Sequence, residues 1–208
     1  MCGRFWNWHI RDFGRGLRYE YLTQNENPEK LKNAGKVIGK FGVGLKDALA
    51  TLRRRKVAVL IGCAYCDISL IETAKHDFED VITLQASVSP PNNPQMIGTD
   101  FELQGVTSAE VKAAKDFFLK FSGERVLDQT SYGQILEKAK ERAARVYVTG
   151  LLVAEEECFA FSHNITSLTA AMRRALNRER TNVGRTAYAD RVKAMLLASQ
   201  SGEVAQRR

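Results

Sequence analysis

The chain has 208 residues, of which 44% are hydrophobic and 26% are charged, and it carries a formal net charge of +7. This composition excludes a disordered chain, a collagen and a disulfide scaffold, and the length allows one large domain or a domain with a small extension. No apolar run approaches the roughly 20 residues of a membrane helix, and the start does not resemble a signal peptide. We therefore expect a cytoplasmic protein that does not contact a membrane.

The first half of the chain contains two glycine-rich segments. Turn residues and periodicity predict, in order, a strand over 5–10, a glycine-rich turn over 11–17, a long loop with a short helix over 18–36, a second glycine-rich turn over 39–45, and a helix over 45–53. Trp6, Trp8 and Ile10 alternate along the first strand and therefore share one face.

Four strands follow one another through short connections, which favours antiparallel pairing. They are predicted over 57–62, 67–73, 81–88 and 96–103. A capping box at Thr107 and Glu110 predicts a helix that reaches Phe121. The remaining elements are a weak strand near Val126, a helix over 132–142, a hairpin of 146–148 and 151–154, a short strand over 159–161, and helices over 167–177 and 186–197. This order predicts an α+β fold, a two-layer sandwich with a mainly antiparallel sheet and helices on one face, and a small α+β extension.

The cysteines and histidines do not form a pattern typical of a metal site. Cys63 and Cys66 form a single C-x-x-C, whereas a zinc site needs about four ligands. A redox pair and two buried cysteines are the alternatives, and we favour the buried pair. His9, His76 and His163 have no partners at ligand spacing, so we expect structural or exposed roles for them.

The end of the chain carries most of the positive charge. Residues 171–208 contain nine basic and three acidic residues, which accounts for +6 of the +7. Such a segment can bind nucleic acid or another polyanion, although a solvated helical face is the simpler interpretation. The residues considered for such contacts are Arg173, Arg174, Arg178, Arg180 and Arg185.

The two glycine motifs have the chemistry of a nucleotide site. In the segment Asp12-Phe-Gly14-Arg-Gly16, the carboxylate can accept a hydrogen bond from an exocyclic amine, and the glycines let a flat ring lie against the backbone. In the segment 39–45, glycines precede a helix whose free N–H groups can bind an anion, most often phosphate. Each motif is weak alone, and an Asx-type turn is the alternative for the first.

The pair of motifs resembles the GHKL ATPases of the Bergerat fold, a family that includes DNA gyrase, the ninety-kilodalton heat-shock chaperones, MutL, histidine kinases and MORC proteins. The resemblance covers about residues 5–126, and it rests on Asp12-x-Gly14-x-Gly16, on 39–45 and on the segment Gly98-Thr99. It implies an ATP-binding domain over 1–127 and a basic extension over 128–208. The implied cofactors are ATP and Mg²⁺, and the implied nucleotide-binding residues are Asp12, Gly14, Gly16, Gly39, Lys40, Phe41, Gly42, Val43, Gly44, Leu45 and Thr99.

The chain departs from this family at the catalytic step. The family places a glutamate and a magnesium-binding asparagine on a helix before the first glycine motif, and residues 1–11 read as a strand instead. We therefore expect ATP binding with very slow hydrolysis, no catalytic or metal residue within the chain, and a truncated or hydrolysis-deficient form. Glu20 and Glu26 are weak substitutes for the base. An uncovered patch at Trp6 and Trp8 would favour association into oligomers.

Two other functions stay open. One is a nucleic-acid or partner-binding module that uses the basic extension. The other is a part of a complete ATPase in DNA transactions, chaperoning, signalling or phage defence.

Overall fold

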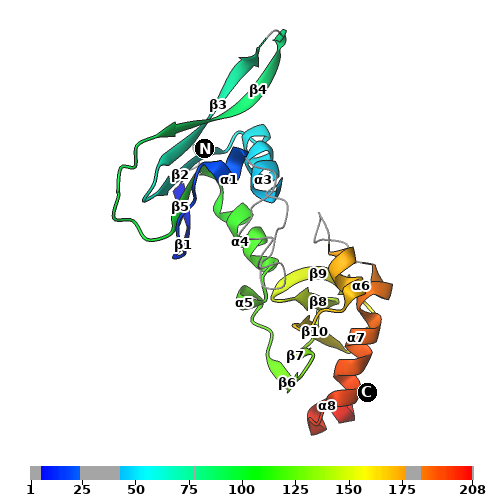
Figure 1. The fold of residues 1–208 in the computed structure, drawn as a ribbon. Coiled ribbons are helices and arrows are strands. Elements are labelled where there is room, and N and C mark those ends of the chain that lie inside the picture. Colours follow the sequence, from blue (N-terminus) through cyan, green and yellow to red (C-terminus); the bar gives the residue numbers. More distant parts are fainter. Residues whose placement is uncertain (1–5, 24–42, 77, 177–183, 208) are drawn as a thin grey trace, which may run out of the picture. The chain divides into compact units, whose positions relative to one another are not determined.

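The structure of the chain is a computed structural model that describes residues 6–23, 43–76, 78–176 and 184–207 (Figure 1). Contacts between residues divide the chain into two compact units, 1–108 and 109–208. The boundary expected after residue 127 is wrong, because it falls inside a strand that pairs within the second unit. Within the described ranges, no helix is long and apolar enough to cross a membrane.

The first unit is a five-stranded antiparallel sheet with helices. Its elements are β1 (Trp6–Asp12), α1 (Glu20–Thr23), α3 (Val43–Arg54), β2 (Ala58–Cys63), β3 (Asp67–Lys75), β4 (Phe78–Ser89) and β5 (Thr99–Val106). The strand order is β1-β5-β2-β3-β4, and the predicted antiparallel pairing is confirmed at all four junctions.

Alternation along the strands gives this sheet one apolar and one polar face. Val59, Ile61 and Cys63 are buried and pack with Leu49 of α3. Because Trp8 pairs with Leu103 and Ile10 with Phe101 of β5, both residues of β1 point to the same face, but Ile10 of this edge strand is 61% exposed. The apolar face is therefore well covered under α3 and less covered along β1.

Polar side chains hydrogen-bond to one another on the opposite face. His9 Nδ1 lies 2.7 Å from Asp100 Oδ2, and Asn7 donates to Glu102 Oε1 at 2.7 Å. The hydrogen bond to Asp100 raises the pKa of His9 above its ordinary value. A polar, solvated face opposite a helix-covered face is the expected pattern of a two-layer α+β unit, and the predicted fold class is confirmed.

The second unit has its own five-stranded sheet. Its elements are α4 (Ser108–Asp116), α5 (Leu119–Ser122), β6 (Val126–Thr130), β7 (Gly133–Glu137), β8 (Ala144–Val148), β9 (Leu151–Glu156), β10 (Phe161–Ile165), α6 (Ala170–Ala175), α7 (Arg185–Ala198) and α8 (Gly202–Gln206). The strand order is β6-β7-β10-β8-β9, and β8 and β10 run parallel whereas the other pairs are antiparallel.

The core of the second unit lies between this sheet and the last three helices. Val146 and Phe161 come from the sheet, Met172 from α6, Met195 from α7 and Val204 from α8. All five are at most 2% exposed. The small extension expected after residue 127 is thus the larger part of a unit with a complete core.

The helix predicted over 132–142 is wrong. Residues 131 and 132 form a tight turn in which Thr130 Oγ1 accepts a hydrogen bond from the Tyr132 N–H at 3.2 Å, and the strand β7 follows. A Cβ on Gly133 would lie 2.1 Å from the Asn164 carbonyl oxygen, so the glycine lets β7 approach β10 closely. Ile135 is fully buried in this strand, and its burial overrides the local helical pattern.

Two other elements differ from their predicted bounds. The helix expected to reach Phe121 is interrupted, because the Phe117 carbonyl accepts from Leu152 N–H and the Leu119 N–H donates to the Gly150 carbonyl, both at 2.8 Å. These bonds tie the chain to the β8–β9 hairpin instead of extending α4. The strand expected over 159–161 begins at Phe161 and continues to Ile165 in the centre of the sheet.

Candidate functional site

The predicted adenine contacts lie side by side at one end of the first sheet. In the pairing of β1 with β5, Asp12 is opposite Thr99, and in the pairing of β5 with β2, Thr99 is opposite Cys63. The three residues therefore form one row across the sheet. Asp12 is exposed, whereas Thr99 is 3% exposed.

The turn after β1 is organised by the Asp12 side chain. Its Oδ1 atom accepts a hydrogen bond from the Gly14 N–H at 2.7 Å, which is an Asx-type turn. Within the described part of the chain, the Oδ2 atom of Asp12 has no hydrogen-bond partner. The carboxylate thus has one oxygen bound to the turn and another able to accept a donor.

Gly98, which directly precedes β5, lets β1 and β5 approach each other closely at this end of the sheet. Its φ is +83°, and a Cβ at this position would lie 1.9 Å from the Asp12 carbonyl oxygen. Only glycine permits this close approach. Gly98 belongs to the Gly98-Thr99 segment of the sequence resemblance, but the predicted nucleotide-binding residues did not include it.

The turn between β2 and β3 contacts the glycine-rich turn that follows β1, at Gly16 and Leu17. Cys63 Sγ donates to the Leu17 carbonyl at 3.0 Å, and the Tyr65 ring lies 3.2 Å from the position of a Cβ on Gly16. The Arg18 guanidinium lies 5.0 Å from the centre of the Tyr65 ring. Tyr65 was missed in the sequence, where it is an isolated aromatic residue in a short turn.

Both cysteines of the C-x-x-C are buried free thiols, as we favoured from the sequence. Cys63 ends β2, Cys66 lies in the following turn, and their Sγ atoms are 4.0 Å apart. Burial raises the pKa of the Cys66 thiol to about 11, which keeps it protonated and unreactive at neutral pH. The described residues include no group of three His, Cys, Asp or Glu side chains that could hold a metal ion.

The second glycine motif is described only in part. Gly39, Lys40, Phe41 and Gly42 lie outside the described residues, as does Glu26. Val43, Gly44 and Leu45 form the first turn of α3, so the helix begins two residues earlier than predicted. Leu45 packs against the core of the unit.

The basic residues of the second unit have different environments. Arg173 and Arg174 are exposed in the last turn of α6, whereas Arg178 and Arg180 lie outside the described residues. Arg185 pairs with Glu156 and lies 5.3 Å from the centre of the Phe159 ring. Its hydrogen bonds hold the pKa of Glu156 below the ordinary value. Through this ion pair, Arg185 joins the start of α7 to the end of β9.

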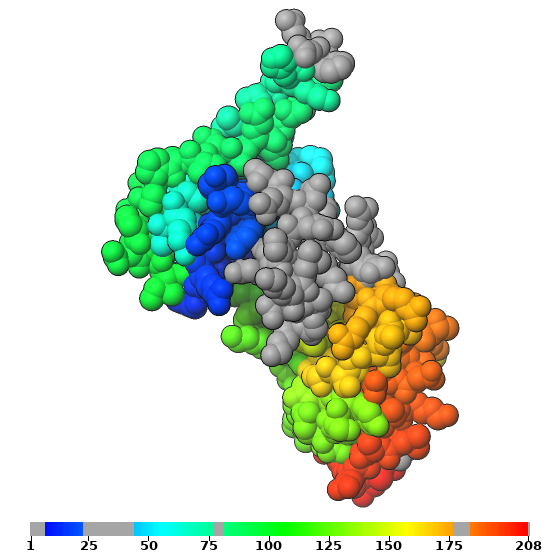
Figure 2. Space-filling view, in the orientation of Figure 1, coloured from blue at the N-terminus to red at the C-terminus, as the bar shows by residue number. Residues whose placement is uncertain are grey.

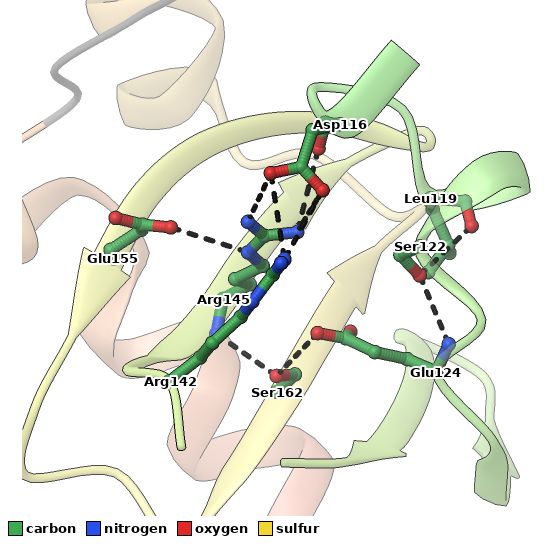
Figure 3. Close-up of polar contacts among 8 residues, drawn as sticks. All are labelled: Asp116, Leu119, Ser122, Glu124, Arg142, Arg145, Glu155 and Ser162. Atoms are coloured by element: carbon green, nitrogen blue, oxygen red, sulfur yellow. Dashed lines mark hydrogen bonds and ion pairs between the residues drawn. The ribbon is translucent and has the colours of Figure 1, made fainter. Parts of the chain in front are cut away.

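A second polar cluster surrounds Arg145, a buried arginine within the apolar strand β8 (Figure 3). Its guanidinium binds Asp116 at the end of α4, with the shortest contact at 2.8 Å, and Glu155 of β9 at 3.2 Å. Arg142 also binds Asp116 at 3.2 Å. The hydrogen bond from Arg145 lowers the pKa of Asp116, so this cluster joins α4 to the sheet through charged groups.

Glu124 and Tyr147 extend this cluster into the interior. The Ser162 hydroxyl donates to Glu124 Oε1 at 3.3 Å and accepts from the Arg145 N–H at 2.9 Å (Figure 3). Burial raises the pKa of both Glu124 and Tyr147, so both groups hold their protons more tightly than in water. The sequence motifs do not predict this cluster, and its signal in the sequence is a charged residue inside an otherwise apolar strand.

His163 is buried on β10 and makes an edge-to-face contact with Phe159 at 5.8 Å between ring centres. Burial lowers its pKa from 6.5 to about 4. Between these values the unfolded chain binds a proton that the folded chain does not. The free energy of unfolding should therefore decrease as the pH falls from 6.5 to 4.

We expect His163 to make the second unit less stable at pH 5 than at pH 7 by about 2 kcal/mol. The measurement is the free energy of unfolding in urea at both pH values, for the wild type and for His163→Leu. The variant cannot bind the proton and should lose that part of the pH dependence. Equal pH dependence in the two proteins would show that His163 does not titrate on unfolding.

Comparison with known proteins shows that the chain is similar to proteins of Mycoplasma pneumoniae. A family model described as the Mycoplasma pneumoniae MPN635 N-terminal domain matches residues 109–202, which lie in the second unit. One uncharacterized protein of Mycoplasma pneumoniae is 24% identical over 110 residues, which cover 52% of this chain and 31% of that protein. No solved structure matches the chain.

A longer match to a protein of the same organism includes both units. This uncharacterized protein of Mycoplasma pneumoniae is 31% identical over 192 residues. The match covers 91% of this chain and 76% of the relative. The chain therefore belongs to the family of this Mycoplasma pneumoniae protein.

Proposed function

We propose that the first unit binds an adenine nucleotide at the end of its sheet, in the manner of the GHKL ATPases that its glycine motifs resemble. The observation that carries this proposal is the pairing register that puts Asp12 opposite Thr99. These two residues are 87 positions apart in the sequence, and the proposed site requires them to be neighbours.

The Asp12 carboxylate supplies the recognition of adenine. One of its oxygens is bound by the Gly14 N–H, and the other accepts a hydrogen bond from the exocyclic amine of the base. Guanine presents a carbonyl acceptor at the equivalent position of its ring, which would face the carboxylate unfavourably. The site should therefore prefer ATP and ADP to GTP.

The first turn of α3 supplies N–H groups for the phosphates. A helix start has four N–H groups without partners inside the helix, and it carries the positive end of the helix dipole. Val43, Gly44 and Leu45 form this turn. Gly44 is exposed, and a Cβ there would meet no atom within 4 Å, so the backbone is accessible at this point. Magnesium would enter with the nucleotide phosphates.

The substitution Asp12→Asn tests the proposal with little change to the turn. Asparagine keeps the side-chain oxygen that accepts from the Gly14 N–H and replaces the other oxygen by an amide NH2 group, which is a hydrogen-bond donor. An unpaired donor costs about 1–3 kcal/mol, so ATP affinity should fall about 5- to 150-fold. Isothermal titration calorimetry with ATP, ADP and GTP measures this change.

Asp190→Asn is the matched control, because Asp190 is an exposed aspartate on α7 in the second unit. This variant should bind ATP as the wild type does. Equal ATP affinity of the wild type and Asp12→Asn would contradict the assigned role of Asp12, and the absence of any adenine-nucleotide binding by the wild type would contradict the function itself.

A further inference from the structure

The β3–β4 hairpin extends beyond the rest of the first sheet (Figures 1 and 2). Within the described residues, β3 pairs with β2 only through Asp67, Ile68 and Ser69, whereas its pairing with β4 continues to Lys75. From Leu70 onward the hairpin is therefore a two-stranded ribbon. Such a ribbon has marginal stability in water unless a third strand or another surface packs on it.

Exposed strand edges usually carry charges or irregularities that prevent pairing with other chains. The edge strand β1 carries His9, Arg11 and Asp12, and it has an irregular register between Trp6 and Trp8. The outer side of β3 is protected in the same way. Glu72 binds Arg53 of α3 at 2.8 Å, and Lys75 is exposed near the tip. Along the described residues, the exposed edges of β1 and β3 therefore both have recognisable protection.

The edge strand β4 lacks such protection over most of its length. Residues 81–89 read Val-Ile-Thr-Leu-Gln-Ala-Ser-Val-Ser and contain no charge, glycine or proline. β-branched residues favour the extended conformation here. Ile82 is 68% exposed and Val88 is 46% exposed. The strand order leaves the outer side of β4 without a described neighbour.

We propose that β4 pairs antiparallel with β4 of a second copy of this chain, so that two sheets join into one continuous sheet across a two-fold axis. The nine uncharged residues pair completely when the axis passes through Gln85. In this register Ile82 lies opposite Val88 of the second copy, Leu84 opposite Ala86, and Gln85 opposite Gln85.

The residue pattern of β4 favours a second copy over an unrelated partner. Ile82, Leu84, Ala86 and Val88 alternate along the strand and share the apolar face of the sheet, so the pairing brings apolar residues together from both chains. Thr83, Gln85 and Ser87 share the other face and likewise meet polar residues. No charged residue faces a like charge.

The sequence also limits the pairing at both ends. The register centred on Gln85 places Asp80 opposite Pro90 of the second copy. Proline has no N–H to donate, so the ladder of backbone hydrogen bonds ends there. The uncharged segment and the paired segment therefore have the same limits.

Introducing a charge at Gln85 tests both the interface and its register. In Gln85→Lys two ammonium groups lie opposite each other, and in Gln85→Glu two carboxylates do. The dissociation constant of each variant's dimer should be at least about fivefold higher than that of the wild type. An equimolar mixture should recover dimers that contain one chain of each variant. Sedimentation equilibrium of the full chain gives the dissociation constants, and native mass spectrometry identifies the mixed dimer.

Ile71→Lys is the matched control. Ile71 lies opposite Gln85 within the hairpin and is 43% exposed, but it belongs to β3 and not to the proposed interface. This variant should dimerise as the wild type does, and circular dichroism of all variants checks their folding. A wild type that stays monomeric would overturn the proposal. Unchanged dimerisation of Gln85→Lys would also overturn it, as would weakened dimerisation of the two variants that is not restored when they are mixed.

Discussion

Replacing Gly98 by alanine is expected to destabilise the first unit by about 3–5 kcal/mol, close to the whole stability of a small unit. The added Cβ would lie 1.9 Å from the Asp12 carbonyl oxygen and 2.8 Å from Phe13 Cα. The backbone there also has a φ of +83°, which is unfavourable for alanine. Asp12 cannot move away without losing its pairing with Thr99. The substitution should therefore separate β1 from β5.

Tryptophan fluorescence during urea denaturation measures this effect in the first unit specifically. The chain has two tryptophans, Trp6 and Trp8, and both lie in β1. Gly105→Ala is the control, because Gly105 belongs to the same strand and has a φ of +94°, but its Cβ would meet the Lys56 carbonyl oxygen at an ordinary 3.4 Å. It should cost about 1–2 kcal/mol. Similar losses in both variants would show that the close approach to Asp12 is not the cause.

Phe161→Ala should destabilise the second unit by about 3–5 kcal/mol, because it removes a large side chain from a closely packed core. Phe161 is 2% exposed and packs in the core between the sheet and the last three helices. The cavity would lie at the start of β10, which pairs with both β7 and β8.

Hydrogen exchange of the backbone amides in β7, β8 and β10, followed by mass spectrometry, measures the loss. Phe121→Ala removes the same side chain from a position that is 52% exposed, so it should change stability by no more than about 0.5 kcal/mol. If Phe161→Ala retained the exchange protection of the wild type, the packing described for this core would be wrong.

Much of the first unit could be predicted from local patterns. The alternation of β2 and the helical spacing of α3 follow from the burial of one face of each element. Asp12 and Thr99 were expected to cooperate, and the register places them opposite each other. Gly98 was harder to assign, because its role depends on a backbone contact with a residue far away in the sequence.

The second unit was less predictable because long-range pairing determines its strands. β10 reads Phe-Ser-His-Asn-Ile, and three polar residues in five do not indicate a buried strand. They are tolerated because two of them find hydrogen-bond partners: Ser162 accepts from the Arg145 N–H, and Asn164 donates to Gln134 Oε1 at 2.8 Å. Such partners become visible only in the folded chain.

The position of β10 between β7 and β8 has a consequence for the order of folding. β6 with β7 and β8 with β9 are hairpins whose strands are close in sequence, so each can form early and locally. Neither hairpin can join the other until residues 161–165 insert between them. During synthesis, residues up to Ile165 must therefore leave the ribosome before the second sheet can close. Until then, two incomplete sheets with open inner edges would be the species most exposed to misfolding and to chaperones.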